Sequence, residues 1–381
     1  MSKLTETIRY VGVNDTAKSL FEGLWPLPKG VSYNSYLVTG EKTALIDTAD
    51  AAFAEEFLAN VKAEAGDRKI DYLIVNHMEP DHSALMGLIR GEWPEIRIVT
   101  SAKAVPMIAG YHGLTDNIDV VKEGDTLDLG AGVVLQFFMA PMVHWPEVMV
   151  TYLASEKTLF SADAFGTFGV VEGQVNACRF ADYREEMIRY YANIVGKFGV
   201  PVQAALKKLS SLEIKRLCST HGPVWEDELG DVVALYDRLS RYEGEKGVCI
   251  VYGSMYGNTE KAALALAASL EEKGVPYAIH NLCTENISFA LMDAFRYDTI
   301  AAGAPTYNNE IFPKVSHFIS ALEGRCLRHR RFFAFGSYTW AGSSVRKMNE
   351  RAQNMGFELV SDGISFAQGY SPEKVVFPDF K

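Results

Sequence analysis

The sequence predicts an α/β protein of two domains, a sandwich of mixed sheets followed by a doubly wound parallel sheet. The length of 381 residues corresponds to two domains at about 150 residues each. The first two thirds interleaves helices with short strands and hairpin signals, which favours mixed sheets. The last third alternates strands, glycine-bearing loops and helices, which indicates a parallel sheet. We expect domains at 1–245 and 246–381, joined by the charged segment 242–247.

Short apolar or alternating runs predict the strands of the first domain. Tyr36–Val38 and Thr43–Asp47 flank Gly40, which is a hairpin signal, and a helix is expected at Ala51–Ala65. Further strands are expected at Ile70–Val75, Ile96–Thr100, Val133–Ala140, Val148–Leu153, Thr158–Ser161 and Leu217–Thr220. In the second domain we expect strands Val248–Tyr252, Tyr277–Asn281, Thr299–Gly303 and Arg331–Phe335, with helices at Thr259–Lys273 and from Pro313.

Composition excludes several classes of protein. The 37 basic residues against 48 acidic ones give a net charge of -11, which argues against nucleic-acid binding. No apolar run approaches the ~20 residues of a membrane-spanning helix, and Met1–Phe21 has no apolar region typical of a signal peptide. The 5 cysteines are widely spaced and form no C-x-x-C pair, so they are expected to be small buried residues of a reducing compartment. We therefore expect a cytoplasmic protein.

The strongest local motif follows the expected strand Ile70–Val75. It places His77, Glu79, Asp81 and His82 within six residues. Pro80 prevents a helix from starting earlier, so His77 and Glu79 can point to the same side, whereas Asp81 and His82 open the next helix. Two imidazoles and two carboxylates in an apolar context are costly without a cation. The spacing fits two metals better than one, although a surface loop could carry such residues without a metal.

Three more candidate ligands each follow an expected strand. They are His144, Asp163 and His221. Each alone is weak evidence, because a single histidine near a strand end is more often a packed core or loop residue. Strand ends can gather on one rim of a sandwich, so together these residues complete a metal-binding set.

The order H-x-E-x-D-H, His, Asp, His resembles the flavodiiron branch of the metallo-β-lactamase fold. Hydrolytic members usually have a second histidine where this chain has Glu79, and the additional carboxylate shifts the preference from zinc toward iron. The resemblance implies that His77, Glu79 and His144 hold one iron, and that Asp81, His82 and His221 hold the other. It also implies that Asp163 bridges the two irons.

Two aromatic motifs also resemble this family. Trp145-Pro146-Glu147 follows His144 directly, and we weigh a packed aromatic residue with a turn proline equally against a role near a flavin. The second motif, Tyr190-Tyr191, lies on an expected helix over Asp182–Lys197. One tyrosine is expected to be core, and the resemblance implies that the other, Tyr191, supplies a hydroxyl group to the metal pocket.

The second domain begins with a loop suited to a phosphate group. After Val248–Tyr252 the chain continues as a loop of small and hydroxylated residues that leads into a helix, and backbone amides at a helix N-terminus bind phosphate. The loop has no lysine and no G-x-G-x-x-G, so neither a nucleoside triphosphate nor a dinucleotide is expected. A monophosphate fits, and FMN is the usual one on a flavodoxin-like sheet.

Two later loops extend this site, and in order along the chain all three resemble those of flavodoxins. Tyr307 and Trp340 are expected to flank the isoalloxazine ring, although either alone could be an aromatic loop cap. The expected FMN-binding residues are Ser254, Met255, Tyr256, Gly257, Asn258, Thr259, Pro305, Thr306, Tyr307, Asn308, Asn309, Ser337, Tyr338, Thr339, Trp340, Ala341 and Gly342.

The resemblance covers nearly the whole chain and implies a metallo-β-lactamase-like αββα sandwich fused to a flavodoxin-like domain. It implies reduction of O2 to water, or of NO to N2O, at a non-haem diiron site with Asp163 and Tyr191 as catalytic residues. Two alternatives remain open: a zinc-dependent hydrolase with an accessory flavodoxin module, and an electron-transfer protein with a vestigial metal site. A hydrolase has no use for an electron carrier, whereas a gas-reducing diiron site must be recharged.

The resemblance also implies partners. These are an electron donor such as rubredoxin, or reduced F420 in some relatives, and a second copy of the chain in a head-to-tail homodimer or dimer of dimers. A basic run near the expected flavin loop, containing Arg325, Arg328, Arg330 and Arg331 with His329, could steer an acidic donor. A solvated loop is the simpler explanation of such a charge run.

Overall fold

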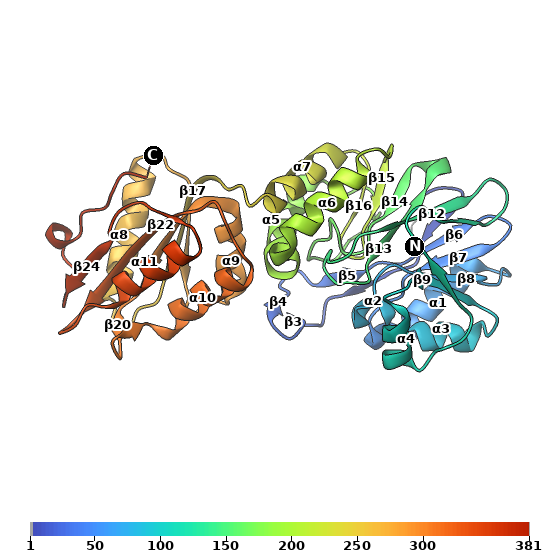
Figure 1. The fold of residues 1–381 in the computed structure, drawn as a ribbon, viewed down its shortest axis with the longest axis horizontal. Coiled ribbons are helices and arrows are strands. Elements are labelled where there is room, and N and C mark those ends of the chain that lie inside the picture. Colours follow the sequence, from blue (N-terminus) through green and yellow to red (C-terminus); the bar gives the residue numbers. More distant parts are fainter. Residues whose placement is uncertain (1–2, 381) are drawn as a thin grey trace. The chain divides into compact units, whose positions relative to one another are not determined.

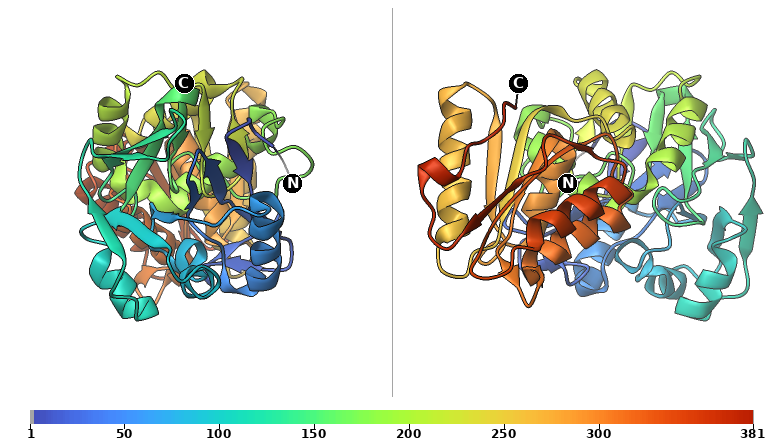
Figure 2. Two further views of the ribbon diagram at one scale, coloured as in Figure 1. Left: turned by 90° about the vertical axis from the view of Figure 1, so that its right-hand side faces the viewer. Right: turned by 60° about the vertical axis from the view of Figure 1, so that its left-hand side comes forward.

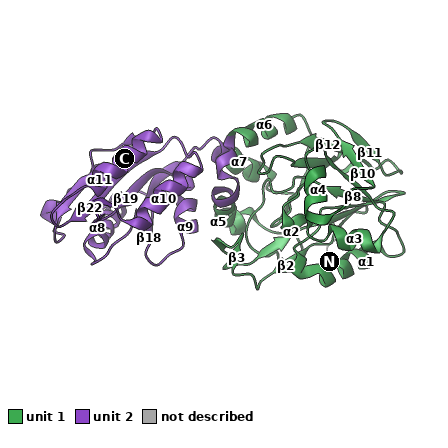
Figure 3. Ribbon diagram, turned by 60° about the horizontal axis from the view of Figure 1, so that its bottom comes forward, with its two compact units in different colours: residues 1–190, 200–237 green, residues 191–199, 238–381 purple. Residues whose placement is uncertain are grey.

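The computed structural model describes residues 3–380 and divides into two compact units (Figure 3). Residues 1–190 and 200–237 form the first unit, and residues 191–199 and 238–381 form the second. The expected linker 242–247 is not a free loop, because strand β17 (Glu245–Tyr252) begins inside it and Tyr242 is buried. The division into domains at 1–245 and 246–381 stays a prediction.

Two six-stranded sheets form the centre of the first unit (Figure 1). The first sheet contains, in order, β1 (Ile8–Tyr10), β6 (Tyr36–Thr39), β7 (Thr43–Ile46), β8 (Tyr72–Val75), β9 (Arg97–Ser101) and β10 (Ile118–Val121). The second contains β11 (Thr126–Asp128), β12 (Val134–Met139), β13 (Met149–Leu153), β14 (Thr158–Phe160), β15 (Arg216–Cys218) and β16 (Val224–Trp225). Both sheets mix parallel and antiparallel pairs, for example β7 with β8 and β12 with β13. The predicted mixed sheets are confirmed.

Helices cover the outer faces of both sheets (Figures 1 and 2). On one side lie α1 (Ala54–Ala65), α3 (Met86–Glu92) and α4 (Val105–His112), and on the other lie α5 (Phe180–Tyr190), α6 (Gly199–Leu209) and α7 (Leu229–Ser240). Buried side chains from both sheets, such as Tyr36, Ile74, Phe137 and Phe160, form one apolar core. The predicted αββα sandwich is therefore confirmed, since burial of the two inner faces requires this layering.

The second unit contains a parallel sheet in the order β18 (Tyr277–Asn281), β17, β19 (Tyr297–Gly303), β22 (Arg331–Tyr338) and β23 (Glu358–Leu359), and β24 (Ile364–Ala367) also pairs with β22. Its helices are α8 (Asn258–Glu272), α9 (Ile287–Arg296), α10 (Pro313–Gly324) and α11 (Ser344–Asn354). In Figure 2 the gold helix α8 lies on one face of this sheet, and the orange and red helices α10 and α11 lie on the other. This is the predicted doubly wound arrangement.

Short strand pairs complete the fold. In the first unit β2 (Val13–Asp15) pairs with β5 (Val31–Tyr33), and β3 (Leu20–Phe21) pairs with β4 (Trp25–Pro26). In the second unit β20 (Thr306–Tyr307) pairs with β21 (Glu310–Ile311). Within residues 3–380 no helix has the length and apolar character needed to cross a membrane.

Candidate functional site

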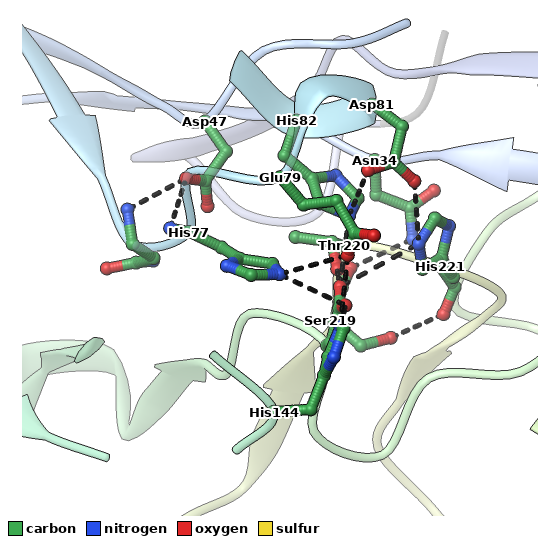
Figure 4. A network of polar contacts seen from close by, with 12 residues as sticks. Asn34, Asp47, His77, Glu79, Asp81, His82, His144, Ser219, Thr220 and His221 are labelled. Carbon is green, nitrogen blue, oxygen red and sulfur yellow. Dashed lines mark hydrogen bonds and ion pairs between the residues drawn. The ribbon is translucent and has the colours of Figure 1, made fainter. Parts of the chain in front are cut away.

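The main cluster of ionisable residues begins in the loop after β8. Asp47, which follows β7, accepts hydrogen bonds from the backbone N–H groups of Asn76 at 2.8 Å and His77 at 3.3 Å, and so holds this loop in place (Figure 4). Glu79 has extended backbone before the short helix α2 (Pro80–Ser83). His77 and Glu79 therefore leave an extended segment, whereas Asp81 and His82 belong to the first turn of a helix, as the position of the proline predicts.

The first of two ligand groups consists of His77, Glu79, His144 and Asp163, all of which are buried. One donor atom from each lies within 4.8 Å of the others. Nε2 of His144 is 3.0 Å from both Glu79 Oε2 and Asp163 Oδ2, and Nε2 of His77 is 3.2 Å from Glu79 Oε2. Two imidazoles and two carboxylates whose donor atoms lie this close together could bind a cation.

The second group consists of Asp81, His82 and His221. His221 Nε2 is 3.4 Å from Asp81 Oδ2, and His82 Nε2 is 3.5 Å from Asp81 Oδ1. Asp163 lies between the groups, because its Oδ1 is 3.0 Å from His82 Nε2 while its Oδ2 faces His144. A carboxylate with one oxygen toward each group has the geometry of a bridge.

Unsatisfied polar atoms test whether this set suits metal ions. Both carboxylate oxygens of Asp81, both ring nitrogens of His82 and Nε2 of His221 are buried and form no hydrogen bond within the described part of the chain. Buried polar groups normally have a partner, and a cation would supply one to most of these atoms. The residues therefore fit a dimetal centre, and the structure brings together all seven residues that the sequence predicts as ligands. Their individual roles as ligands stay predictions.

The side chains of the cluster strongly perturb one another's pKa values when no cation is present. Burial alone would lower the pKa of His144, but its hydrogen bonds with Asp163 and Glu79 raise that pKa to about 9. Burial opposes the shift of His82 in the same way, and the charges of Asp81 and Asp163 raise its pKa to about 9. Burial alone would raise the pKa of Asp163, yet the histidines hold it well below its ordinary value. Histidine ligands bind metals in the neutral form, so we expect metal binding to this cluster to release protons.

Tyr190, rather than Tyr191, lies beside this cluster. Its ring centroid is 5.5 Å from that of His221 and 5.1 Å from that of Phe168, and its buried hydroxyl group has no hydrogen-bond partner within residues 3–380. Tyr191 instead packs in the second unit, with its ring 6.1 Å from that of Phe295. The predicted helix over 182–197 changes at this point, because α5 ends at Tyr190 and a π-helical segment, Tyr191–Val195, follows. No residue type or spacing in this segment predicts that change.

The motif Trp145-Pro146-Glu147 lies next to the first ligand group. The Trp145 ring is 5.5 Å from that of His77, and Glu147 Oε1 is 2.8 Å from His77 Nδ1. Burial would raise the pKa of Glu147, but its contacts with His77 and the backbone N–H of Met78 lower it. The motif contacts a predicted ligand, which neither of its two sequence interpretations specified.

Glu22 also approaches the cluster, and the sequence analysis missed it. It is an exposed residue of the turn between β3 and β4, and the Trp25 indole N–H donates to its Oε2 at 2.9 Å. Partial burial of its carboxyl group and then the negative charge of Glu79 raise its pKa to about 7. An acidic residue in a surface turn carries no sequence signal for such a position.

In the second unit, a cavity of about 570 Å³ lies at the carboxyl ends of the parallel strands. Of the 17 predicted flavin-binding residues, 14 line it, and the exceptions are Gly257, Thr259 and Gly342. Thr259 is buried and hydrogen-bonds the hydroxyl of Ser337 at 3.0 Å. The cavity also includes Gln368, which the prediction missed. Its position just after β24, at the same edge of the sheet, was the signal that could have identified it.

The loop before α8 suits a phosphate group. Ser254 Oγ accepts from the backbone N–H groups of Gly257 at 3.1 Å and Glu260 at 3.4 Å, which holds the loop in a tight turn. Gly257, the residue before the helix, has a φ of 84° and makes no side-chain capping bond. Gly257 has no side chain to cap the helix, so the backbone N–H groups at the start of α8 that Ser254 does not bind can receive an anion.

Two of the aromatic residues around this cavity are not packed as loop caps. Tyr256 and Trp340 are each 88% exposed, and Tyr307 is 42% exposed. A residue that caps a loop would lie against the protein, so these rings are free to contact a planar ligand. This arrangement of apolar rings and polar loop residues fits FMN.

The predicted basic patch near the flavin loop is wrong in one respect. Arg330 is buried and donates to the carbonyl groups of Ala294 and Phe295 at 2.9 Å. Arg325 donates to the carbonyl of Ala192 at 2.6 Å. The unsatisfied carbonyl groups at the end of α9 attract the guanidinium of Arg330, so this residue has a structural role. Arg328 and His329 are exposed.

Comparison with known proteins is consistent with both units. The family model described as ODP family beta lactamase matches residues 31–222, and the flavodoxin model matches residues 250–373. The first range includes all seven predicted metal ligands, and the second includes every residue that lines the flavin-sized cavity.

Similarities to individual proteins extend over most of the chain. The chain is 35% identical over 359 residues to the anaerobic nitric oxide reductase flavorubredoxin of Citrobacter koseri, covering 92% of this chain and 74% of that protein. The structure of the present chain resembles that of rubredoxin oxygen:oxidoreductase from Desulfovibrio gigas. The TM-score is 0.92 at 28% identity, and the match covers 98% of this chain and 94% of that one. The flavodiiron protein from Giardia intestinalis gives a TM-score of 0.92 at 28% identity, covering 97% and 92%.

Proposed function

The chain belongs to the flavodiiron proteins, and from this membership we propose that it reduces O2 to water, or NO to N2O, at a non-haem diiron site that receives electrons through FMN. The observation that carries the proposal is the placement of Asp163 between two ligand groups, with one carboxylate oxygen toward each. The names of the relatives include both gases: one is called a nitric oxide reductase and another a rubredoxin oxygen:oxidoreductase.

In this proposal His77, Glu79 and His144 hold one iron, and Asp81, His82 and His221 hold the other. Asp163 would contribute a ligand to both irons. The burial and short distances of these residues support the assignment. Three carboxylates among seven ligands favour iron over zinc, because carboxylate oxygen is a harder donor than imidazole nitrogen. When bound, the two irons supply electrons and coordination positions for the gas.

The protein's own residues shape the pocket around the gas. Phe21 and Phe168 lie beside His221 and Tyr190, and these apolar rings limit the access of water. The hydroxyl group of Tyr190 is buried without a protein partner among the described residues, so it can donate a hydrogen bond to a bound oxygen or nitrogen atom. Tyr190 takes the role that the sequence analysis gave to Tyr191.

FMN binds in the cavity of the second unit in this proposal. The loop Ser254–Thr259 and the N-terminus of α8 would hold the phosphate group, and Tyr307 and Trp340 would contact the ring system. When bound, FMN supplies one-electron transfer. We further propose that a rubredoxin-type protein, or reduced F420, is the electron donor, and that the chain acts as a head-to-tail homodimer or as a dimer of such dimers. All five cysteines are free thiols, which supports a cytoplasmic location, but Cys283 and Cys326 are exposed, so the expectation that every cysteine is buried is wrong for these two.

Two measurements test this function. Metal analysis of the purified protein should give about two irons per chain, whereas about two zinc ions would favour a hydrolase with an accessory flavodoxin module. Anaerobic stopped-flow mixing of the reduced protein with O2 and with NO, in separate experiments, should give rapid reoxidation of FMN by at least one gas. If neither gas reoxidises an iron-loaded protein, the proposed reaction is wrong.

A further inference from the structure

A carboxylate binds the His77 ring at Nδ1, the nitrogen that faces away from the first ligand group. Its Nδ1 lies 2.8 Å from Oε1 of Glu147, while its Nε2 faces Glu79 and Asp163 at 3.2 Å and 3.5 Å. His77 is fully buried, so water does not compete for this contact. A carboxylate acceptor at Nδ1 selects the tautomer with its proton on that nitrogen. The lone pair of Nε2 then points into the first ligand group.

Glu147 is itself fixed by its surroundings. Oε1 also accepts from the backbone N–H of Met78 at 2.9 Å, and its main-chain carbonyl accepts from the Ser101 hydroxyl at 2.6 Å. Glu147 is buried, and its Oε2 has no hydrogen-bond partner among residues 3–380. The His77 ring and the backbone N–H of Met78 thus both donate to Oε1 of Glu147. This oxygen links the His77 ring to the backbone of the next residue.

Among the described residues, no carboxylate hydrogen-bonds the Nδ1 atom of a histidine in the second ligand group, although the negative charge of buried Asp47 acts on His82. Nδ1 of His221 lies 2.8 Å from the main-chain carbonyl oxygen of Ser32, which is a neutral acceptor. Nδ1 of His82 is buried and has no hydrogen-bond partner in the described chain. An anionic acceptor increases the basicity of a ligating imidazole more than a neutral one does. The two ligand groups therefore differ in the hydrogen-bond partners of their histidines as well as in the predicted ligands themselves.

We propose that Glu147 is a positioning residue for His77 and that it makes the two metal positions unequal. The position formed by His77, Glu79 and His144 binds its metal more tightly than the position formed by Asp81, His82 and His221. This inference rests on the proposed dimetal function, because it requires that both groups bind metal. It concerns the order of loading and loss, which the assignment of ligands alone leaves open.

Stepwise metal titration tests the proposal. The metal-free full-length protein is titrated anaerobically with Co²⁺ as a spectroscopic probe, and absorption bands report each step. In unaltered protein we expect two steps of unequal affinity. Glu147→Gln keeps an acceptor at Oε1 and removes the charge, so it should weaken the tighter step by about tenfold, and Glu147→Ala should weaken it by up to about 100-fold. The weaker step should be unchanged.

A matched control separates the carboxylate from the packing of its loop. Ser101→Ala removes the hydrogen bond to the Glu147 carbonyl but leaves the carboxylate, so both steps should remain as in unaltered protein. Glu147→Asp keeps the charge at a shorter reach, and it should retain more of the first-step affinity than Glu147→Ala. If Glu147→Ala does not fold, the comparison between Glu147→Gln and Ser101→Ala still shows whether the Glu147 carboxylate strengthens the first binding step.

Two other results would overturn the inference. Equal weakening of both steps by Glu147→Gln, or no weakening of either, would show that the carboxylate does not distinguish the positions. Identical affinities in unaltered protein would do the same. Failure of the unaltered protein to bind two Co²⁺ ions would instead remove the dimetal function on which the inference rests, and this outcome is visible before any variant is made.

Discussion

The ring of Tyr190 lies 5.5 Å from the ring of His221, although 30 residues lie between them in the sequence. The contact brings the end of α5 to the loop after β15, beside the second ligand group. Tyr191, the next residue, belongs to the other unit. The change from α-helix to π-helix between these two residues thus places Tyr190, and not Tyr191, beside the second ligand group.

We expect Tyr190→Phe to slow gas reduction by at least about tenfold, because it removes a hydroxyl group that can donate to the bound gas. Metal and FMN content should not change. The free energy of unfolding should stay the same or rise, since the buried hydroxyl has no protein partner among the described residues. Stopped-flow reoxidation by O2 and NO measures the rate.

Tyr191→Phe is the matched comparison for this variant. If the structural placement is right, its reoxidation rate should equal that of unaltered protein. A slow Tyr191→Phe protein together with a normal Tyr190→Phe protein would instead favour the original sequence prediction.

The metal preference should depend on Glu79. We expect Glu79→His to restore the pattern typical of hydrolytic relatives, to lower iron retention and to raise zinc binding, because a carboxylate is replaced by a softer imidazole. Metal content after growth in medium containing both metals measures the effect. An unchanged ratio of iron to zinc would remove the argument from ligand hardness.

The motifs of both sites could be predicted because their residues follow strands directly. His77 to His82 come after β8, and the FMN loops come after β17, β19 and β22, so the expected strands place them at sheet edges. Glu22 could not be found in this way, since it lies in a surface turn with no chemical pattern around it. Gln368 does follow a strand, but that strand, β24, was not among those expected from the sequence. The break of the expected helix at Tyr190 and the burial of Arg330 depend on tertiary contacts. Local sequence patterns do not record such contacts.

The two sites should be separable by mutation. Asp163→Ala should abolish gas reduction but leave the FMN spectrum intact, because Asp163 and the flavin cavity belong to different units. Thr339→Trp should fill the cavity from an exposed position and release FMN while iron remains bound. Metal analysis and the flavin absorption spectrum measure both effects. Loss of both cofactors in either variant would count against the predicted division at residue 245.

His280 should make the stability of the second unit depend on pH. Its Nδ1 lies 2.7 Å from Glu285 and its Nε2 lies 2.9 Å from Asp293, which also pairs with Arg296. Burial alone would lower the pKa of His280, but the hydrogen bonds with Asp293 and Glu285 raise it to about 9. Because the folded-state pKa is raised, the stabilisation is fully present below about pH 6.5 and is lost as the pH rises to about 9.

The raised pKa of His280 sets the size of the pH-dependent stabilisation. This shift corresponds to at most about 3 kcal/mol in the free energy of unfolding. We expect the difference in urea midpoint between unaltered protein and His280→Gln to be largest at pH 6 and to be nearly absent at pH 10. Asp293→Asn should reduce the same difference. A difference that is constant with pH would show that the charge of His280 does not contribute.

Arg328 and Arg330 should have different functions, although the sequence groups them in one basic run. Arg330→Ser removes a buried guanidinium that donates to the carbonyl groups of Ala294 and Phe295, so it should lower the free energy of unfolding by about 2 kcal/mol or more. Arg328→Ser should leave stability unchanged, because the residue is exposed. Urea unfolding of the two variants measures this contrast.

Only Arg328 of this pair remains available to steer an acidic donor. If it does so, Arg328→Ser should slow the reduction of FMN by a rubredoxin-type protein and flatten the dependence of that rate on ionic strength, because steering by exposed charge is screened by salt. Reduction by dithionite, measured on the same preparation, should be unaffected by comparison. A variant that keeps the unaltered rate and the unaltered salt dependence would show that this exposed arginine has no part in recognising the donor.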